Sequence, residues 1–418
     1  MTTATTSRAV RSVTTVEWVA LGLLIVSIGI NYIDRGNLSV AGLALKDELN
    51  LNGTQLGWLL SAFFWTYAGF QVVSGWLIDR YKVVWVYAAG YFIWSAATLF
   101  TGMVNGFAML FTLRLILGMS ESVAYPSYSK IIAAGFPERQ RGIANGLIDA
   151  GSKLGPALGV LVGGMLLSRF GWRWLFILIG AASMIWLIPW AAVARNIRTG
   201  ASAHLSEGRT DTASFREILG QRDAWGTFLG LFCANYGWYF LLTWLPQYFM
   251  LERHYSTTMM AQLGSLPFWS VATGAVIGGF ASDRWIDSGA TPTLVRKTFV
   301  IGGLTLFAII LLPAAIVKDP TVALWLISIA SFCLGLFSSN HWAVTQTLAG
   351  TAAAGKWTGM QNMSGNIAGI VVPVVTGRIY DATGHFFWAF VCVCGLVLIG
   401  ALSYLVIIRR IEPVTWHG

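Results

Sequence analysis

The sequence GWLIDR at residues 75–80 returns as GFASDR at residues 279–284, and this repeated pattern decides the fold. Glycine, aspartate and arginine keep the same spacing in both copies. A second echo joins 142–156 to 359–373, where glycine, asparagine, an Asp or Asn, and proline again keep their spacing. The chain is therefore predicted to contain two structural repeats of similar length.

The composition indicates a membrane protein. Of the 418 residues, 56% are hydrophobic and 11% are charged, and the mean hydropathy is +0.65. In soluble domains about a quarter of the residues are charged. The formal net charge is +9, but a nucleic-acid-binding surface needs a solvated basic face, which so apolar a chain does not offer. We therefore expect a lipid bilayer as surroundings and no nucleic-acid partner.

Twelve apolar segments are long enough to cross a bilayer, which takes about 20 residues of helix. Backbone polar groups in lipid must be satisfied internally, so these segments are predicted to be helices rather than open strands. The expected fold is an all-α membrane protein with twelve transmembrane helices in two pseudo-symmetric six-helix bundles. The expected spans are 17–40, 55–78, 85–104, 107–134, 139–168, 172–194, 223–250, 258–281, 296–317, 322–349, 356–380 and 386–408.

Basic residues set the orientation, because loops rich in lysine and arginine stay in the cytoplasm. They gather in the segments on the same side as the N-terminus, so both termini are expected to be cytoplasmic. The polar stretch 195–222 is predicted to be a cytoplasmic linker between an N-terminal bundle, 1–194, and a C-terminal bundle, 223–418. A cleaved signal peptide at the start is the alternative, but it explains the same arginines less well.

Two six-helix repeats are typical of secondary transporters, whose substrate site lies between the repeats near the bilayer midplane. The four cysteines fall in apolar segments, and neither a metal-ligand spacing, a phosphate loop nor a nucleophile-base constellation is present in the sequence. We therefore expect no enzymatic activity, no metal and no cofactor.

Ionisable residues inside the spans mark candidate sites, because each costs on the order of 3 kcal/mol to hold at membrane depth. An arginine that moves between a carboxylate and an anionic substrate can couple proton release to anion release. All the ionisable residues away from the span ends, apart from one histidine, lie in the N-terminal half: Asp34, Arg35, Arg114, Glu121, Asp149 and Lys153.

The segments around these charges resemble a known superfamily. GWLIDR before a basic loop is similar to the signature of the major facilitator superfamily, although Tyr81 stands where the signature has glycine. NYIDRGNLSV at 31–40 and RLILGMSESVAYP at 114–126 resemble the anion:cation symporter family within it. That family includes bacterial sugar-acid permeases and sialin-like and vesicular glutamate carriers.

The resemblance implies roles for particular residues. Asp34 and Glu121 would carry protons, and Arg35 and Arg114 would bind the anion and couple it to them. The repeated motif would lock the cytoplasmic side closed. Its residues are Gly75, Asp79 and Arg80 in the first half and Gly279, Asp283 and Arg284 in the second.

Neutral hydrogen-bonding residues dominate the C-terminal half. They suit the hydroxyls of a polyol chain, although such groups also bond helix to helix in membranes. His341 is expected to be a hydrogen-bonded core histidine rather than a ligand. The neutral substrate-binding residues predicted for the two halves together are Tyr67, Gln71, Asn235, Tyr239, Asn362 and Asn366.

Asp149 and Lys153 depart from the pattern of the resembled family. They lie one helical turn apart, which allows an internal ion pair that would let both survive at membrane depth. They could equally form a third charged element of the substrate site. The sequence leaves both interpretations open.

The sequence as a whole predicts a proton-coupled symporter. It would take up a small organic carboxylate such as a hexonate, hexuronate or aldarate by alternating access, as a monomer in a bacterial inner membrane. Open alternatives are a carrier of aromatic or other carboxylates, and an anion exchanger or exporter. A non-transporting membrane sensor is the alternative from a different class.

Overall fold

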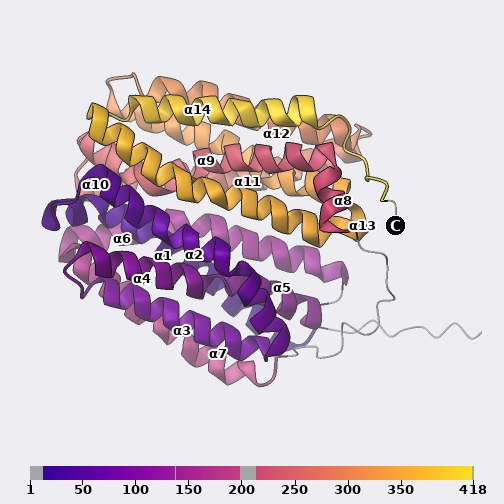
Figure 1. Ribbon diagram of the computed structural model, residues 1–418, viewed down its shortest axis with the longest axis horizontal. Coiled ribbons are helices and arrows are strands. Elements are labelled where there is room, and N and C mark those ends of the chain that lie inside the picture. Colours follow the sequence, from indigo (N-terminus) through magenta and orange to yellow (C-terminus); the bar gives the residue numbers. More distant parts are fainter. Residues whose placement is uncertain (1–12, 137, 198–212, 417–418) are drawn as a thin grey trace, which may run out of the picture.

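The computed structural model describes residues 13–136, 138–197 and 213–416, and nearly all of them are helical. Two groups of long helices lie side by side, with α8 and the C-terminus at one end of the molecule (Figure 1). The first group holds α1 (Thr15–Glu48), α2 (Gly53–Arg80), α3 (Val83–Thr101), α4 (Phe107–Glu121), α5 (Ala124–Gly135), α6 (Glu138–Ile185) and α7 (Leu187–Ala194).

The second group follows the predicted linker, part of which lies outside the described residues. It comprises α8 (Phe215–Gly220), α9 (Arg222–Leu251), α10 (Thr257–Leu263), α11 (Leu266–Asp287), α12 (Pro292–Ala314), α13 (Pro320–Thr383), α14 (Phe387–Leu402) and the π-helix η2 (Ser403–Ile407). The described part of the chain holds no strand, which confirms the all-α fold class.

Every expected span falls on helix, and nine helical stretches among the described residues are long and apolar enough to cross a membrane. Three expected spans are not counted separately. Two of the twelve lie in the continuous stretch Gly146–Ala194, and the nine stretches do not include α2 or the part of α13 after Gly350. Both of these carry polar residues that line a pocket. The full number of twelve stays a prediction.

Two glycines divide the longest helices. Gly171 in α6 has φ 80° and Gly350 in α13 has φ 58°, both in the left-handed region that a residue without a Cβ adopts readily. The two breaks fall between expected spans, where a chain must reverse to cross the membrane again.

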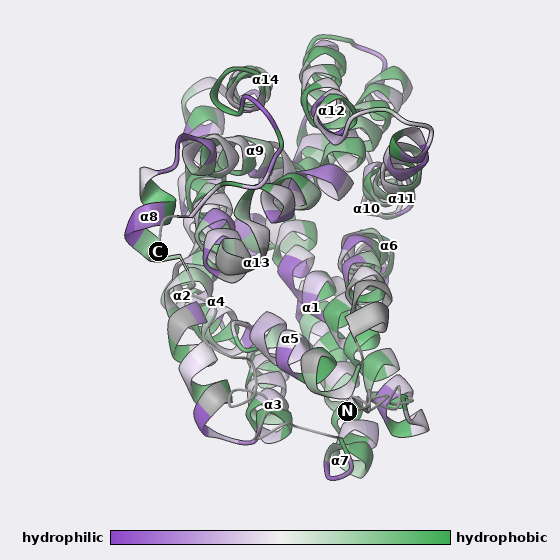
Figure 2. Ribbon diagram, turned by 90° about the vertical axis from the view of Figure 1, so that its right-hand side faces the viewer, coloured by the Kyte–Doolittle hydropathy of each residue, from purple (hydrophilic) through white to green (hydrophobic). Residues whose placement is uncertain are grey.

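Hydrophobic side chains cover much of the molecule's outer surface, as a lipid environment requires. Large apolar residues such as Trp76, Val276, Phe280 and Ile188 are more than half exposed. Figure 2, which looks nearly along the helices, shows α1 to α7 and α9 to α14 as two groups around the middle of the molecule.

The two groups touch at one end, here called the outer end because the sequence assigns its loops to the outside. There the Asp381 carboxylate of α13 accepts hydrogen bonds from the backbone N–H groups of Gly53 and Thr54, at 2.7 and 2.6 Å, where α2 begins. A Cβ added to Gly57 of α2 would lie 2.4 Å from the carbonyl oxygen of Pro373 in α13. Close backbone approach therefore seals this end.

Candidate functional site

A pocket of about 550 Å³ lies between the two groups of helices. That volume is within the range of small-molecule sites. Residues from α1, α2, α5 and α6 line one side, and residues from α9, α11 and α13 line the other. Nine of the predicted substrate-binding residues line it: Arg35, Tyr67, Gln71, Asp149, Lys153, Asn235, Tyr239, Asn362 and Asn366. Their roles as ligands stay predictions.

Arg35 is the best-defined charged group in the pocket. Its Nε donates a hydrogen bond to Glu121 Oε2 at 3.0 Å, and both side chains are buried. The rings of Tyr32, Phe63 and Tyr67 surround the guanidinium carbon at 4.7, 4.9 and 4.4 Å. These contacts fix the guanidinium by cation–π attraction, while its Nη2 has no hydrogen-bond partner among the described residues. The fixed guanidinium thus lines the pocket and keeps hydrogen-bonding capacity that the described residues do not use.

Asp34, Glu121 and Arg114 are buried and do not line the pocket. Asn37 donates to Asp34 Oδ1 at 3.3 Å. In the described part of the chain, Asp34 Oδ2 and Glu121 Oε1 lack hydrogen-bond partners. A buried carboxylate oxygen without a donor is costly, and protonation removes that cost. The role of the two carboxyl groups as proton carriers stays a prediction.

Arg114 was predicted to bind the substrate, but in this conformation it does not reach the pocket. Its guanidinium carbon lies 5.5 Å from the Phe63 ring, which the Arg35 guanidinium also contacts, and Arg114 is not among the residues that line the pocket. No described carboxylate lies within ion-pair distance of it. It therefore adds positive charge near Asp34 and Glu121 rather than a contact in the pocket.

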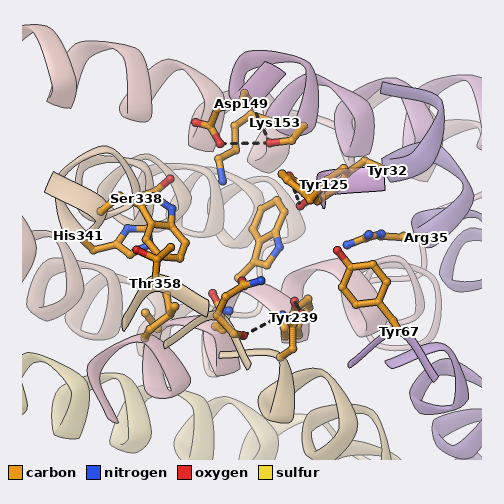
Figure 3. Close-up of a pocket in the computed structure, with 18 of the residues that line it drawn as sticks. Tyr32, Arg35, Tyr67, Tyr125, Asp149, Lys153, Tyr239, Ser338, His341 and Thr358 are labelled. Atoms are coloured by element: carbon orange, nitrogen blue, oxygen red, sulfur yellow. Dashed lines mark hydrogen bonds between the residues drawn. The ribbon is translucent and has the colours of Figure 1, made fainter. Parts of the chain in front are cut away.

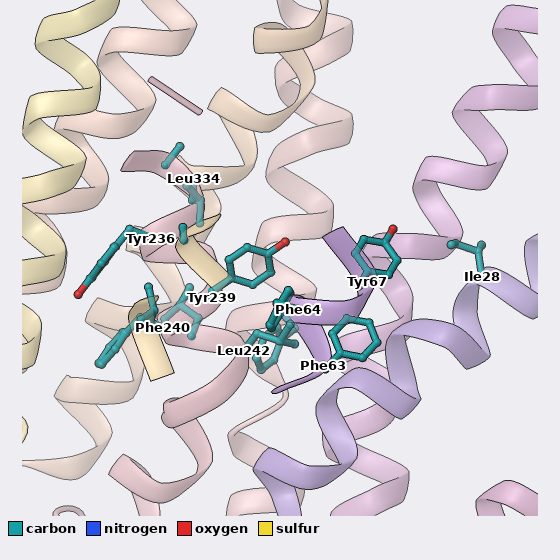
Figure 4. Close-up of a cluster of buried hydrophobic side chains, with 14 of the residues drawn as sticks. Ile28, Phe63, Phe64, Tyr67, Tyr236, Tyr239, Phe240, Leu242 and Leu334 are labelled. Carbon is teal, nitrogen blue, oxygen red and sulfur yellow. The ribbon is translucent and has the colours of Figure 1, made fainter. Parts of the chain in front are cut away.

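Aromatic side chains join the two sides of the pocket. Phe63 and Tyr67 stack at 5.3 Å within α2, and Phe64 meets Tyr239 of α9 edge-on at 4.6 Å. Figure 4 shows these four rings together at the meeting point of the two groups. The Tyr239 hydroxyl donates to Asn366 Oδ1 at 2.8 Å. For Tyr239 and Asn366, bonding from helix to helix is therefore observed.

His341 differs from the expectation of a hydrogen-bonded core histidine. Its ring stacks on Phe337 at 4.8 Å and lies 4.4 Å from the Trp342 ring. The residue is 5% exposed and lines the pocket, yet neither ring nitrogen has a hydrogen-bond partner among the described residues. Aromatic packing thus contributes to holding this histidine in place.

Asp149 and Lys153 form no ion pair with each other in this structure. Asp149 Oδ1 instead accepts a 3.4 Å hydrogen bond from Ser152, and Lys153 Nζ lies 5.6 Å from the Trp238 ring of α9. Figure 3 places both on the α6 side of the pocket, between His341 on one side and Arg35 on the other. Of the two interpretations left open by the sequence, the geometry favours a charged element of the site.

Comparison with known proteins identifies the family. A model described as Major Facilitator Superfamily matches residues 24–373. The chain belongs to this superfamily. It is a multi-pass membrane protein of a transporter family rather than an enzyme.

Similar superfamily members have names that refer to organic anions. "Probable galactarate/D-glucarate transporter GudP" of Bacillus subtilis (strain 168) is 30% identical over 96% of this chain and 94% of its own length. The "D-galactonate transporter" of Escherichia coli O6:H1 is 30% identical over 95% of this chain and 97% of its own. "Probable sulfoacetate transporter SauU" of Cupriavidus necator is 30% identical over 93% of each chain.

A solved structure of another transporter has the same fold. The bacterial homolog of the human lysosomal transporter Spinster, inward-facing and occupied, superimposes with a TM-score of 0.81 over 94% of this chain and 96% of its own. At 18% sequence identity this likeness shows the fold alone.

The repeated superfamily motif makes its described contacts within one half of the chain. Arg296 of α12 donates to Asp283 Oδ1 at 2.8 Å and to Asn340 Oδ1 of α13 at 2.8 Å. Arg296 was not predicted, because it stands at a helix start outside the motif. In the first copy Arg80 lies over the Trp76 ring at 5.7 Å, and the Asp79 side chain lies outside the described residues. The locking role of Gly75, Asp79, Arg80, Gly279, Asp283 and Arg284 stays a prediction.

Proposed function

We propose that this protein is a proton-coupled symporter that takes up a small sugar acid by alternating access. The observation that carries the proposal is the position of Arg35. Its guanidinium faces a pocket between the two helix groups, is held by Glu121 through Nε and leaves Nη2 without a protein partner.

The pocket suits an anion with hydroxyl groups. A carboxylate meeting Arg35 would gain charge-assisted hydrogen bonds, which are among the strong polar contacts in proteins. Gln71, Asn235 and Asn362 line the same pocket with amides that can both donate to and accept from hydroxyls. The relatives named for galactarate, D-glucarate and D-galactonate support a polyhydroxy acid.

Competition for Arg35 supplies the coupling to protons. With no substrate, the Glu121 carboxylate is stabilised by Arg35 and need not hold a proton. When a substrate carboxylate takes Arg35, Glu121 loses its partner in a buried site and protonation becomes favourable. Proton and anion therefore promote each other's binding, which is the thermodynamic requirement of symport. Asp34 supplies a second buried carboxyl group beside this pair.

The conformation matches a pocket reached from the cytoplasm. Every hydrogen bond between the two groups of described residues lies from the middle of α1 towards the outer end, as with Ser39 to Thr243 and Gln247 to Ser39. With both termini cytoplasmic, as the basic residues favour, the opposite end opens inward. The protein would work as a monomer in a bacterial inner membrane.

Uptake into proteoliposomes tests the proposal. Labelled galactonate and galactarate should accumulate above equilibrium when the outside is made acidic, and a proton-conducting ionophore should abolish the accumulation. Uptake that needs an internal anion and ignores the pH gradient would overturn symport in favour of exchange. Uptake of aromatic carboxylates without uptake of either sugar acid would overturn the substrate class.

A further inference from the structure

We infer that Lys153 forms a second anion subsite, so that the pocket favours a sugar acid with a carboxylate at each end over one with a single carboxylate. The inference rests on the proposed function and specifies how many carboxylates the preferred substrate carries. It assigns to Lys153 the selection of dianions.

Lys153 brings a positive charge into the pocket and has no ion-pair partner in the described part of the chain. No described carboxylate lies within ion-pair distance of its Nζ, although Asp149 stands one turn away on the same helix. The nearest described contact of the ammonium group is the face of Trp238 at 5.6 Å. A cation at membrane depth is costly unless something neutralises it, and an anionic ligand group does so.

Helix packing places Lys153 and Arg35 at different depths. A Cβ added to Gly155 would lie 2.5 Å from Tyr32 Cβ, and one added to Gly151 would lie 2.7 Å from the Ile28 side chain, so α6 and α1 run in parallel and in register. Lys153 is therefore level with residues near position 30. Arg35 is about five residues further along, or about 7 Å at 1.5 Å per residue. Figure 3 shows the Arg35 and Lys153 side chains apart along the pocket, an arrangement that suits the two ends of a short acid.

The second half of the chain supplies a partner group at the Lys153 end. His341 is buried, and neither of its ring nitrogens bonds to another side chain among the described residues. It lines the pocket with Ser338, and Figure 3 shows both on the side away from Arg35. An anionic group held by Lys153 and His341 would bridge the two halves of the chain.

Asp149 limits the affinity of this subsite. Its carboxylate lines the same wall of the pocket and would repel a second anionic group. Neutralising it should therefore improve the binding of a dianion more than the binding of a monoanion. Neutralising Lys153 should instead lower the preference for the dianion. Opposite changes in the two variants would separate a charge effect from general damage to the pocket.

The test compares galactarate, a dianion, with galactonate, a monoanion, as competitors of labelled substrate on purified protein. The variants are Lys153→Met, Lys153→Arg and Asp149→Asn, with Lys318→Met as the control because Lys318 is exposed and does not line the pocket. In Lys153→Met the loss of affinity for galactarate should exceed the loss for galactonate by about tenfold or more, which matches a lost charge-assisted contact. Lys153→Arg should restore part of the preference, and Asp149→Asn should increase it.

Equal losses for the two acids in Lys153→Met, or no loss, would overturn the inference. If that variant does not fold, an unchanged galactarate preference in Asp149→Asn would overturn it instead. Failure of the proposed function gives a different result, because wild-type protein would then bind and accumulate neither acid. If galactonate is taken up but the preference for galactarate depends on neither Lys153 nor Asp149, the proposed function stands and only the dianion selection is overturned.

Discussion

The two sides of the pocket differ in charge although they come from repeated halves. Asp149 and Asn366 occupy equivalent places in the repeat and both line the pocket, but one is an acid and the other an amide. Arg35 and Lys153 also come from the first half, whereas the second half lines the pocket with amides, hydroxyls, aromatic rings and His341. The difference indicates that one half handles charge and the other recognises shape and hydroxyls.

This division suits a protein whose halves must move apart and together. The Arg35–Glu121 ion pair lies within the first half, so movement of the halves need not break it. Among the described hydrogen bonds that cross between the halves, those such as Ser39 to Thr243 are neutral and each is worth about 0.5–1.5 kcal/mol, and those to the Asp381 carboxylate are worth about 1.5–3 kcal/mol each. Contacts of that strength can break and reform in every transport cycle.

The largest change should come from Arg35→Lys. The lysine keeps the charge but loses the planar fork and the aromatic packing of the guanidinium. The dissociation constant for galactonate should rise by the equivalent of about 1–3 kcal/mol, the worth of a charge-assisted contact. Competition binding measures it, with exposed Arg410→Lys as the control. An unchanged dissociation constant would place the carboxylate site elsewhere, with Lys153 the next candidate.

Membrane potential should separate the two acids. If Asp34 and Glu121 both carry protons, galactonate enters with a net positive charge and galactarate enters with none. Galactonate accumulation should then respond to potential by about 2.3 kcal/mol per 100 mV, while galactarate accumulation should not. Valinomycin-clamped proteoliposomes measure both. Indifference of galactonate accumulation to potential would mean that only one of the two carboxyl groups titrates.

The double variant Asp149→Asn with Lys153→Met sharpens the assignment of the first half. Since the two groups form no ion pair here, each single variant should fold, and the double variant should not recover the wild-type affinity for galactarate. Thermal melting in detergent and competition binding check the two statements. If each single variant folds poorly while the double variant has wild-type uptake and affinity, the ion-pair interpretation would be restored.

The smallest effect is expected in the second half. Asn366→Ala removes the hydrogen bond from Tyr239, which is worth about 1 kcal/mol, and leaves the charged groups in place. Galactonate affinity should fall modestly, and the pH dependence of uptake should not change. A loss as large as that of Arg35→Lys, or a shifted pH profile, would contradict the division between the halves.

Much of the fold could be predicted because lipid imposes a simple rule on the chain. A run of about 20 apolar residues must be helical, so the spans follow from the sequence. Which space a single charged side chain on an apolar helix reaches is harder to predict, and Arg114 illustrates this. Its position on α4 indicates that it faces inward, but only the tertiary structure shows that it does not line the pocket.

The contacts between side chains were harder to predict than which residues line the pocket. The spacing of Asp149 and Lys153 permits an ion pair, but the pocket and Trp238 offer the lysine another place. His341 was expected to find a hydrogen-bond partner, but its ring stacks on Phe337 and lies against Trp342 of the same helix, and the i,i+4 spacing of Phe337 and His341 was a signal for this that the prediction missed. The contact of Arg296 with Asp283 and Asn340 joins three helices, so it depends on tertiary structure.

The most direct test of proton coupling in the charged half is Glu121→Gln. The amide resembles the protonated acid, so it should leave Arg35 available and keep galactonate counterflow measurable. It should abolish accumulation driven by a pH gradient, because the residue can no longer release a proton. Both rates can be measured in the same proteoliposome preparation, with counterflow as the control for folding. Loss of uphill accumulation with counterflow retained is the predicted result, and undiminished uphill accumulation would contradict proton carriage by Glu121.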